Sequence, residues 1–193
     1  MVSAVTVVLP KRYRNMRFQW LLATLVLTAA GCSAPAASSL APATFEEFAT
    51  NACDAFSAMF RAVGNPDAGT DSELSKALDD AVQRGDPAEA GRLAEAITTE
   101  LERGRQAASQ AAAWPPGFAA MSELDRVLLA FEAMIDAKRQ AAGNNSAPDP
   151  QAAFEAAGGT ASWQGMFEAA RAMQSARPAN LPPHECEGVP ISW

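Results

Sequence analysis

Apolar residues recur at steps of three and four positions along most of the chain after residue 44. The first such series consists of Phe45, Phe48, Ala52, Phe56, Met59, Phe60 and Val63. Residues at these steps share one face of an α-helix. Thr44 and Glu47 have the spacing of a capping box at the start of the series, and Gly-Asn-Pro at residues 64–66 ends it. The pattern therefore predicts a helix from Phe45 to Val63.

Two further helices follow from the same spacing. The second begins after Asp71 or Ser72 and ends at Gly85, a residue type common at the carboxyl end of helices. The third opens at Asp86 and Pro87, because proline is favoured at the first position of a helix. Its apolar positions are Ala90, Leu93, Ala94, Ile97, Leu101 and Ala108.

The remaining helices lie in the carboxyl-terminal half. A Trp-Pro-Pro-Gly break at residues 114–117 precedes a fourth helix, which ends at Gly143. A loop of turn-forming residues then leads to a fifth helix, which starts at Asp149 and Pro150 and which glycines at 158–159 interrupt. Its apolar stripe resumes beyond them.

The fold class follows from these elements. No run alternates between apolar and polar residues for long enough to be a sheet strand. Four prolines exclude regular structure from a tail at residues 178–193. We therefore predict an all-α fold, with a bundle of four or five helices sharing one core in residues 44–177.

The first 31 residues have the outline of a signal peptide. Lys11, Arg12, Arg14 and Arg17 precede an uncharged run that extends over residues 18–30. A helix needs roughly twenty apolar residues to cross a bilayer, and this run of about a dozen is too short for a permanent anchor. Translation from Met16 instead of Met1 would also give a compact signal peptide, so the sequence leaves the initiator open.

The apolar run ends in a segment of small residues, TAAGCS at residues 28–33. This segment resembles the lipobox of bacterial lipoproteins. The resemblance implies that Cys32 carries acyl chains, including palmitate, and that the chain is cut on the amino side of this cysteine. Ala29 stands where lipoboxes commonly have leucine, and an alternative cleavage site, Ala-Pro-Ala at residues 34–36, would release a secreted protein instead.

Charge and composition indicate how such a protein is held. Four of the 15 bases precede Cys32, so the chain from Cys32 onward carries 22 acids against 11 bases, a formal net charge of −11. This excess excludes nucleic acid as a partner and requires acyl chains to supply membrane binding. The uncharged, small residues at 32–43 predict a flexible linker. We expect the domain at the extracytoplasmic face of a bacterial membrane.

Two cysteines remain once Cys32 is lipidated. Cys53 falls in the first predicted helix and Cys186 in the tail, and disulfides persist outside the cytoplasm. We predict a Cys53–Cys186 disulfide that ties the tail to the bundle. In the alternative, Cys53 is a buried thiol and Cys186 is free.

The sequence offers little catalytic chemistry. His184 is the single histidine, so any triad or multi-histidine metal site would need it. The segment His-Glu-Cys-Glu at 184–187 holds metal-ligating residue types, but four consecutive residues rarely enclose one ion. The chain also has no phosphate-binding glycine motif and no zinc-binding motif. We therefore predict no enzymatic activity, metal or cofactor, with an enzyme of unrecognised site as the third hypothesis.

A few large aromatic residues are candidates for contact with a partner or ligand. They are Trp114, Phe118, Trp163 and Trp193. Such residues are typical of interface hot spots, but they also plug the ends of helical bundles. We expect a cell-envelope interaction module that binds an envelope protein or a small ligand. The alternative is a carrier that holds a small apolar ligand among Phe56, Met59, Phe131 and Met166.

Overall fold

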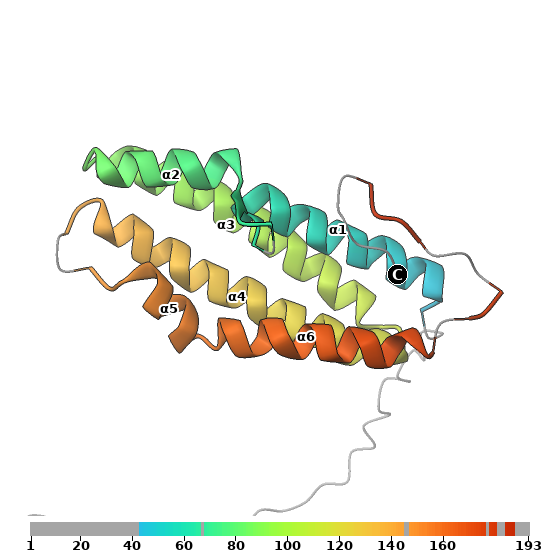
Figure 1. Ribbon diagram of the computed structural model, residues 1–193. Helices are drawn as coiled ribbons and strands as arrows, with labels where there is room; N and C mark the ends of the chain where they lie inside the picture. The colour runs from blue at the N-terminus through green and yellow to red at the C-terminus, as the bar shows by residue number, and fades with distance from the viewer. Residues whose placement is uncertain (1–42, 67, 145–146, 177, 181–183, 188–193) are drawn as a thin grey trace, which may run out of the picture. The chain divides into compact units, whose positions relative to one another are not determined.

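The computed structural model describes residues 43–66, 68–144, 147–176, 178–180 and 184–187. The chain divides into two units, residues 1–39 and 40–193, and all described residues belong to the second. The helices are α1 (Phe45–Val63), α2 (Glu73–Gln83), α3 (Pro87–Ala111), α4 (Phe118–Ala141), α5 (Pro150–Ala156) and α6 (Gly159–Gln174), shown in Figure 1. The predicted all-α class is confirmed. The calls on Cys32 and Trp193 lie outside the described residues.

Capping residues fix where most of these helices begin. The side-chain oxygen of each cap accepts a hydrogen bond from a backbone N–H in the first turn, which would otherwise lack a partner. At α1 the Glu47 carboxylate also accepts from the backbone N–H of Thr44, at 2.8 Å, and completes the capping box. The caps with this geometry are Thr44, Ser72, Asp86 and Asp149.

The described residues form six α-helices, one more than the upper number predicted. The fifth predicted helix corresponds to two helices, α5 and α6, because Gly158 has a φ of 81° and ends α5. Gly159 then starts α6 against the ring of Phe154, where a Cβ would lie 2.4 Å from the ring carbons. The glycine pair therefore separates two elements rather than interrupting one.

A second difference is a short antiparallel pairing of β1 (Gly64–Asn65) with β2 (Thr70–Asp71). Strands of two residues are too short to show an alternating pattern, so the sequence predicted only the end of the first helix at this point. Gly64 has a φ of 99°, and a Cβ there would lie 2.0 Å from the carbonyl oxygen of Thr70. Only glycine fits this close approach.

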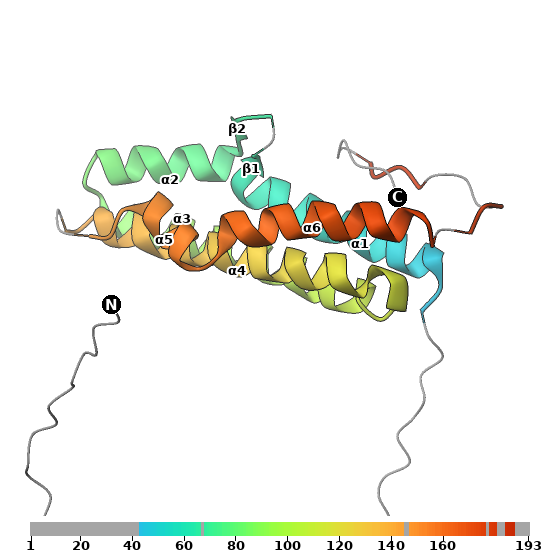
Figure 2. The same cartoon turned by 60° about the horizontal axis from the view of Figure 1, so that its bottom comes forward.

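The long helices α1, α3, α4 and α6 run side by side (Figures 1 and 2). α3 packs between α1 and α4, α4 packs against α5 and α6, and α2 packs on α3. One contiguous core lies among them. Its largest fully buried side chains include Phe48, Phe56, Met59, Leu78, Ile97, Leu101, Met121, Leu124, Leu128, Ile135 and Met166.

Small residues bring α1 and α3 close together. A Cβ on Gly104 of α3 would lie 3.2 Å from the carbonyl oxygen of Ala55 and 3.4 Å from the Cβ of Ala58, both on α1. Larger side chains at these buried positions would push the two helices apart. This contact accounts for glycine at position 104 and for a small side chain at Ala58.

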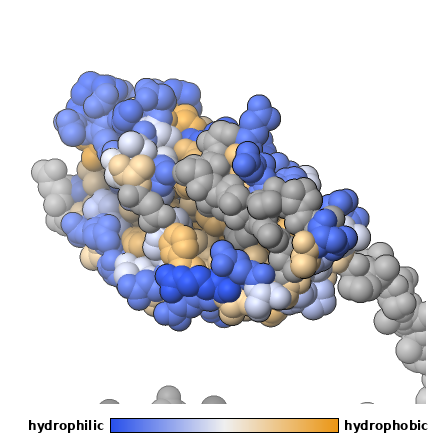
Figure 3. Space-filling view, turned by 45° about the vertical axis from the view of Figure 1, so that its right-hand side comes forward, coloured by the Kyte–Doolittle hydropathy of each residue, from blue (hydrophilic) through white to orange (hydrophobic). Residues whose placement is uncertain are grey.

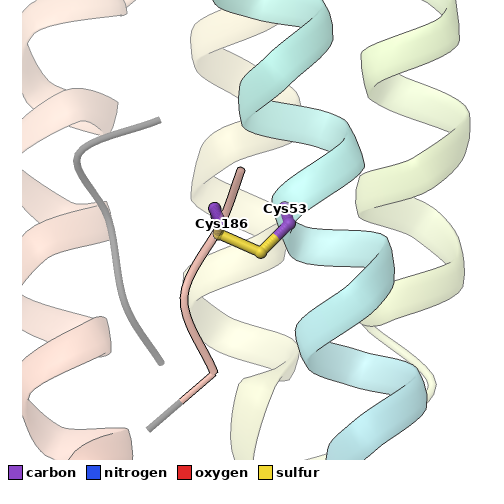
Figure 4. Close-up of a disulfide and its surroundings, with 2 residues drawn as sticks. All are labelled: Cys53 and Cys186. Atoms are coloured by element: carbon purple, nitrogen blue, oxygen red, sulfur yellow. A yellow bond between two sulfur atoms is a disulfide. The ribbon is translucent and has the colours of Figure 1, made fainter. Parts of the chain in front are cut away.

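The tail is fastened to α1 by a disulfide between Cys53 and Cys186 (Figure 4). This is the pairing that the cysteine count predicts. The two residues are 133 positions apart in sequence, and both are buried. Searching the described part of the chain for a helix with the length and hydropathy of a membrane span finds none.

Candidate functional site

The solvent side of the α3–α4 hairpin carries two hollows that lie end to end and share Glu102. The first has a volume of about 610 Å³ and lies near the turn that joins the helices. The second, of about 660 Å³, lies toward the start of α3. We call the two together the α3–α4 groove. Its walls include Gly91, Glu95, Glu102, Arg105 and Ser109 of α3, and Phe118, Ser122, Asp125, Asp136 and Arg139 of α4.

The residues along the groove are spaced at three- and four-residue steps. On α3 they include Glu95, Thr98, Glu102, Arg105 and Ser109, and on α4 Phe118, Ser122, Asp125 and Asp136. Leu129 and Glu132 do not line either hollow but continue the same helical spacing on α4. This spacing places each set on one face of its helix. The sequence analysis missed both stripes because they are mostly polar and have the pattern of an ordinary solvated face. The signal that could have found them is the same helical period, applied to polar residues.

Arg105 forms the electrostatic centre of the groove. Its Nε donates to Asp125 Oδ1 at 2.9 Å, and its Nη1 donates to Glu132 Oε1 at 3.5 Å. Partial burial disfavours the charge of Arg105, but Asp125 and Glu132 outweigh that effect and raise its pKa. Burial also disfavours the charged form of Glu132 and therefore raises its pKa. Arg105 opposes this rise, and the negative charges of Glu102 and Asp125 add to it. The site therefore concentrates negative charge around one cation.

The other arginines of the groove are engaged by neighbouring acids. Arg126 bonds to Glu123 one turn away, and Arg139 donates to Asp136 at 2.5 Å. The hydrogen bond from Arg139 lowers the pKa of Asp136. The carboxylates in these pairs neutralise the positive charge of both arginines.

Two large apolar side chains are exposed in the described part of the chain, and both belong to α4. Phe118 is 58% exposed and lines the first hollow, while Leu129 is 39% exposed on the same helix. On the face shown in Figure 3, hydrophilic residues alternate with apolar ones. Among the predicted contact residues that the structure describes, Phe118 is therefore the one whose side chain is exposed to solvent and lines a hollow.

The neighbouring Trp114 has the opposite environment. It is only 8% exposed, and its ring centroid lies 4.7 Å from that of Phe48 and 5.5 Å from that of Phe45. Of the two roles left open by the sequence, Trp114 therefore plugs the bundle and does not offer a partner contact. Trp163 is partly buried and packs edge-on against Phe167 at 5.3 Å.

The residues expected for the other hypotheses do not form a second site. Phe56, Met59, Phe131 and Met166, which would wall an apolar cavity in a carrier, all belong to the buried core. Within the described ranges, no group of three or more His, Cys, Asp or Glu residues is arranged to hold a metal ion. His184 lies half-buried in the tail.

Comparison of the chain with protein-family models, with characterised proteins and with solved structures gave no match.

Proposed function

We propose that the protein is a bacterial cell-envelope lipoprotein whose helical unit binds another envelope component through the α3–α4 groove. The observation that carries the interaction role is Phe118, a large aromatic side chain that stands 58% exposed at the first hollow. Aromatic residues in such positions are typical of interface hot spots. Full burial of such a side chain contributes about 1.5–3 kcal/mol, so covering the exposed part of Phe118 is worth about 1–2 kcal/mol.

The structure of the hairpin supports this role. Phe118 begins α4, whose inner face is held by the buried side chains of Met121, Leu124 and Leu128. A side chain on a packed helix loses little backbone freedom on binding, which lowers the entropic cost of association. The groove is therefore a pre-formed recognition surface.

The proposed location rests on the lipobox resemblance, and the disulfide agrees with it. The Cys53–Cys186 bond would persist in an oxidising compartment and would be reduced in most cytoplasms. The linker from Ser33 to Ala43 would reach about 34 Å if extended as polyproline II. That reach lets the groove meet a partner near the membrane while anionic headgroups repel the acidic domain.

The carrier hypothesis has less support. Its expected cavity walls are all buried members of the core, whereas the two described hollows of the α3–α4 groove lie on the surface and have charged walls. Sites for small apolar ligands are mostly enclosed and apolar. A macromolecular partner suits an open, charged groove better.

The anchor is tested by expression of the full chain in a bacterial host. Intact-mass analysis of the membrane-extracted protein should give a chain that begins at a diacylated Cys32, and Cys32→Ala should leave the precursor uncut. An unmodified terminus at Ala37 would show cleavage at the alternative site and a secreted protein.

The interaction is tested by a photo-crosslinking amino acid at position 118, in cells of the source organism. A discrete crosslinked product is expected at position 118 and not at position 54, an exposed acid on α1. Competition by excess purified domain should abolish the product, and a Phe118→Ser domain should compete poorly. Equal products at both positions would contradict a specific groove.

A further inference from the structure

The two exposed apolar residues of α4 lie in line. Phe118 and Leu129 are eleven positions apart, and at 100° and 1.5 Å per residue they differ by only about 20° around the helix and lie about 16 Å apart along it. Ser122 and Asp125 occupy the same stripe between them. Two apolar points three turns apart match the repeat of a helix, since residues i and i+11 of a partner helix also share one face.

The groove has the length of a helix. The two hollows extend from Gly91 of α3 to Ala112, the residue that caps its carboxyl end, which corresponds to about 32 Å at 1.5 Å per residue. Small side chains, including Thr98, Ser109 and Ser122, lie along this path. Such residues allow a third helix to approach two packed ones at the usual interaxial distance of about 8–10 Å.

Charge decides which kind of helix fits. Five acids lie along the groove against three arginines. The acids are Glu95, Glu102, Asp125, Glu132 and Asp136, and the arginines are Arg105, Arg126 and Arg139. Each arginine is already paired with a carboxylate, whereas Glu95 and Glu102 form no ion pair with any described residue. The surplus is therefore negative and faces solvent.

We propose that the α3–α4 groove binds a basic amphipathic α-helix of a partner protein. Apolar residues of that helix, three turns apart, cover Phe118 and Leu129, and flanking lysines or arginines pair with Glu102 and its acidic neighbours. This inference rests on the proposed function, and it adds the chemistry of the partner. A second copy of the chain would bring the same acids to the interface, and like charges would oppose self-association.

The test uses the mature, disulfide-bonded protein and a synthetic 21-residue peptide with Leu at positions i, i+4, i+7 and i+11 and Lys at the flanking positions. Binding is measured by fluorescence anisotropy at two salt concentrations. Two comparison peptides, one with Glu in place of Lys and one with the same residues in scrambled order, separate charge and amphipathicity from composition. We expect the Lys peptide to bind at least about tenfold more tightly than either, and more weakly at high salt.

Matched variants locate the binding. Phe118→Ser should weaken it about fivefold to thirtyfold, as expected from losing the apolar contact. Glu102→Gln should weaken it severalfold and reduce its salt dependence, and Asp54→Asn, which removes an exposed acid on α1, should leave it unchanged. Amide exchange with bound peptide should show new protection on α3 and α4, and unchanged circular dichroism would show that the variants are folded.

Several outcomes would overturn the proposal. Equal affinity of all three protein variants would show general attraction to an acidic protein, and equal binding of the Glu peptide would exclude charge recognition. Dimerisation in sedimentation that Phe118→Ser abolishes would assign the groove to a second copy. A specific crosslink at position 118 that the Lys peptide does not displace would refute the basic helix and leave the interaction module standing. If neither the crosslink nor peptide binding is observed, both the interaction role of the groove and the basic-helix proposal are refuted.

Discussion

A methyl group at Gly117, in the turn between α3 and α4, should destabilise the protein. A Cβ at this position would lie 2.4 Å from Cε2 of Phe48 and 3.0 Å from Cε3 of Trp114. Carbon atoms pack best at about 3.5–4.0 Å, so the Phe48 ring would have to move by more than about 1 Å. The ring is fully buried and packs at a tilt of 39° against Trp114, with ring centroids 4.7 Å apart, so close-packed neighbours oppose that movement.

The expected effect of Gly117→Ala is a loss of stability. Overpacking of this kind costs about 1–3 kcal/mol, and because Gly117 is the N-cap of α4, alanine gains no helix-propensity advantage there to offset the cost. The φ of Gly117 is −86°, which alanine adopts freely, so the loss is purely steric. We therefore expect the free energy of unfolding to fall by about 1–3 kcal/mol.

Urea unfolding of the mature protein with its disulfide intact measures this change, as a lower midpoint at constant m-value. Gly91→Ala is the matched control, because Gly91 lies within α3 and a Cβ there has no atom within 4 Å. It should raise stability by up to about 1 kcal/mol. The penalty of Gly117→Ala should largely vanish in a Phe48→Ala background. A Gly117→Ala protein stabilised to the same extent as Gly91→Ala would refute the close packing of this turn.

Three further predictions concern the core, the tail and the surface charges. Reduction of the Cys53–Cys186 disulfide, which links residues 133 positions apart, should lower the free energy of unfolding by about 4–5 kcal/mol in the chain-entropy model. Thiol labelling of the unreduced, denatured protein should find no free thiol at either position. Phe56→Ala should cost about 3–5 kcal/mol in a denaturant melt because it opens a cavity in the core, whereas His184→Ala in the tail should cost almost nothing; equal costs would contradict this division. Arg139 lowers the pKa of Asp136, so the stability that the Asp136 carboxylate contributes is complete above its unfolded-state pKa and is lost as pH falls through the lower folded-state pKa. Asp136→Asn should therefore flatten the decline of the urea midpoint below about pH 4. An unchanged decline would contradict this role of Asp136.

The helices could be predicted from the sequence because their signals are local. Apolar stripes and capping residues lie within a few positions of each other, and α1 begins and ends at the predicted Phe45 and Val63. The separation of α5 from α6 depends instead on the positive φ of Gly158 and on the ring of Phe154 over Gly159, neither of which spacing alone reveals. The β1–β2 pairing likewise depends on a backbone approach at Gly64.

The candidate site was harder to predict because it depends on tertiary arrangement. Trp114 and Phe118 flank the same proline corner, but one faces the Phe45 and Phe48 rings and the other faces solvent. The sequence left both roles open for both residues. The groove itself arises from the way α3 and α4 lie beside each other, and its stripes of charged residues resemble any solvated helix face until that arrangement is known.

The disulfide turns most of the domain into a covalent ring. Cys53 lies midway along α1 and Cys186 lies in the tail, so every loop between them belongs to one closed circuit. A protease that cuts a single peptide bond in any of those loops opens the circuit without separating the pieces, which stay linked through sulfur. A nicked molecule would migrate as one species on a non-reducing gel and as two after reduction. In the proposed lipid-anchored form, one such cut would therefore leave the anchor, the core and the groove in a single molecule.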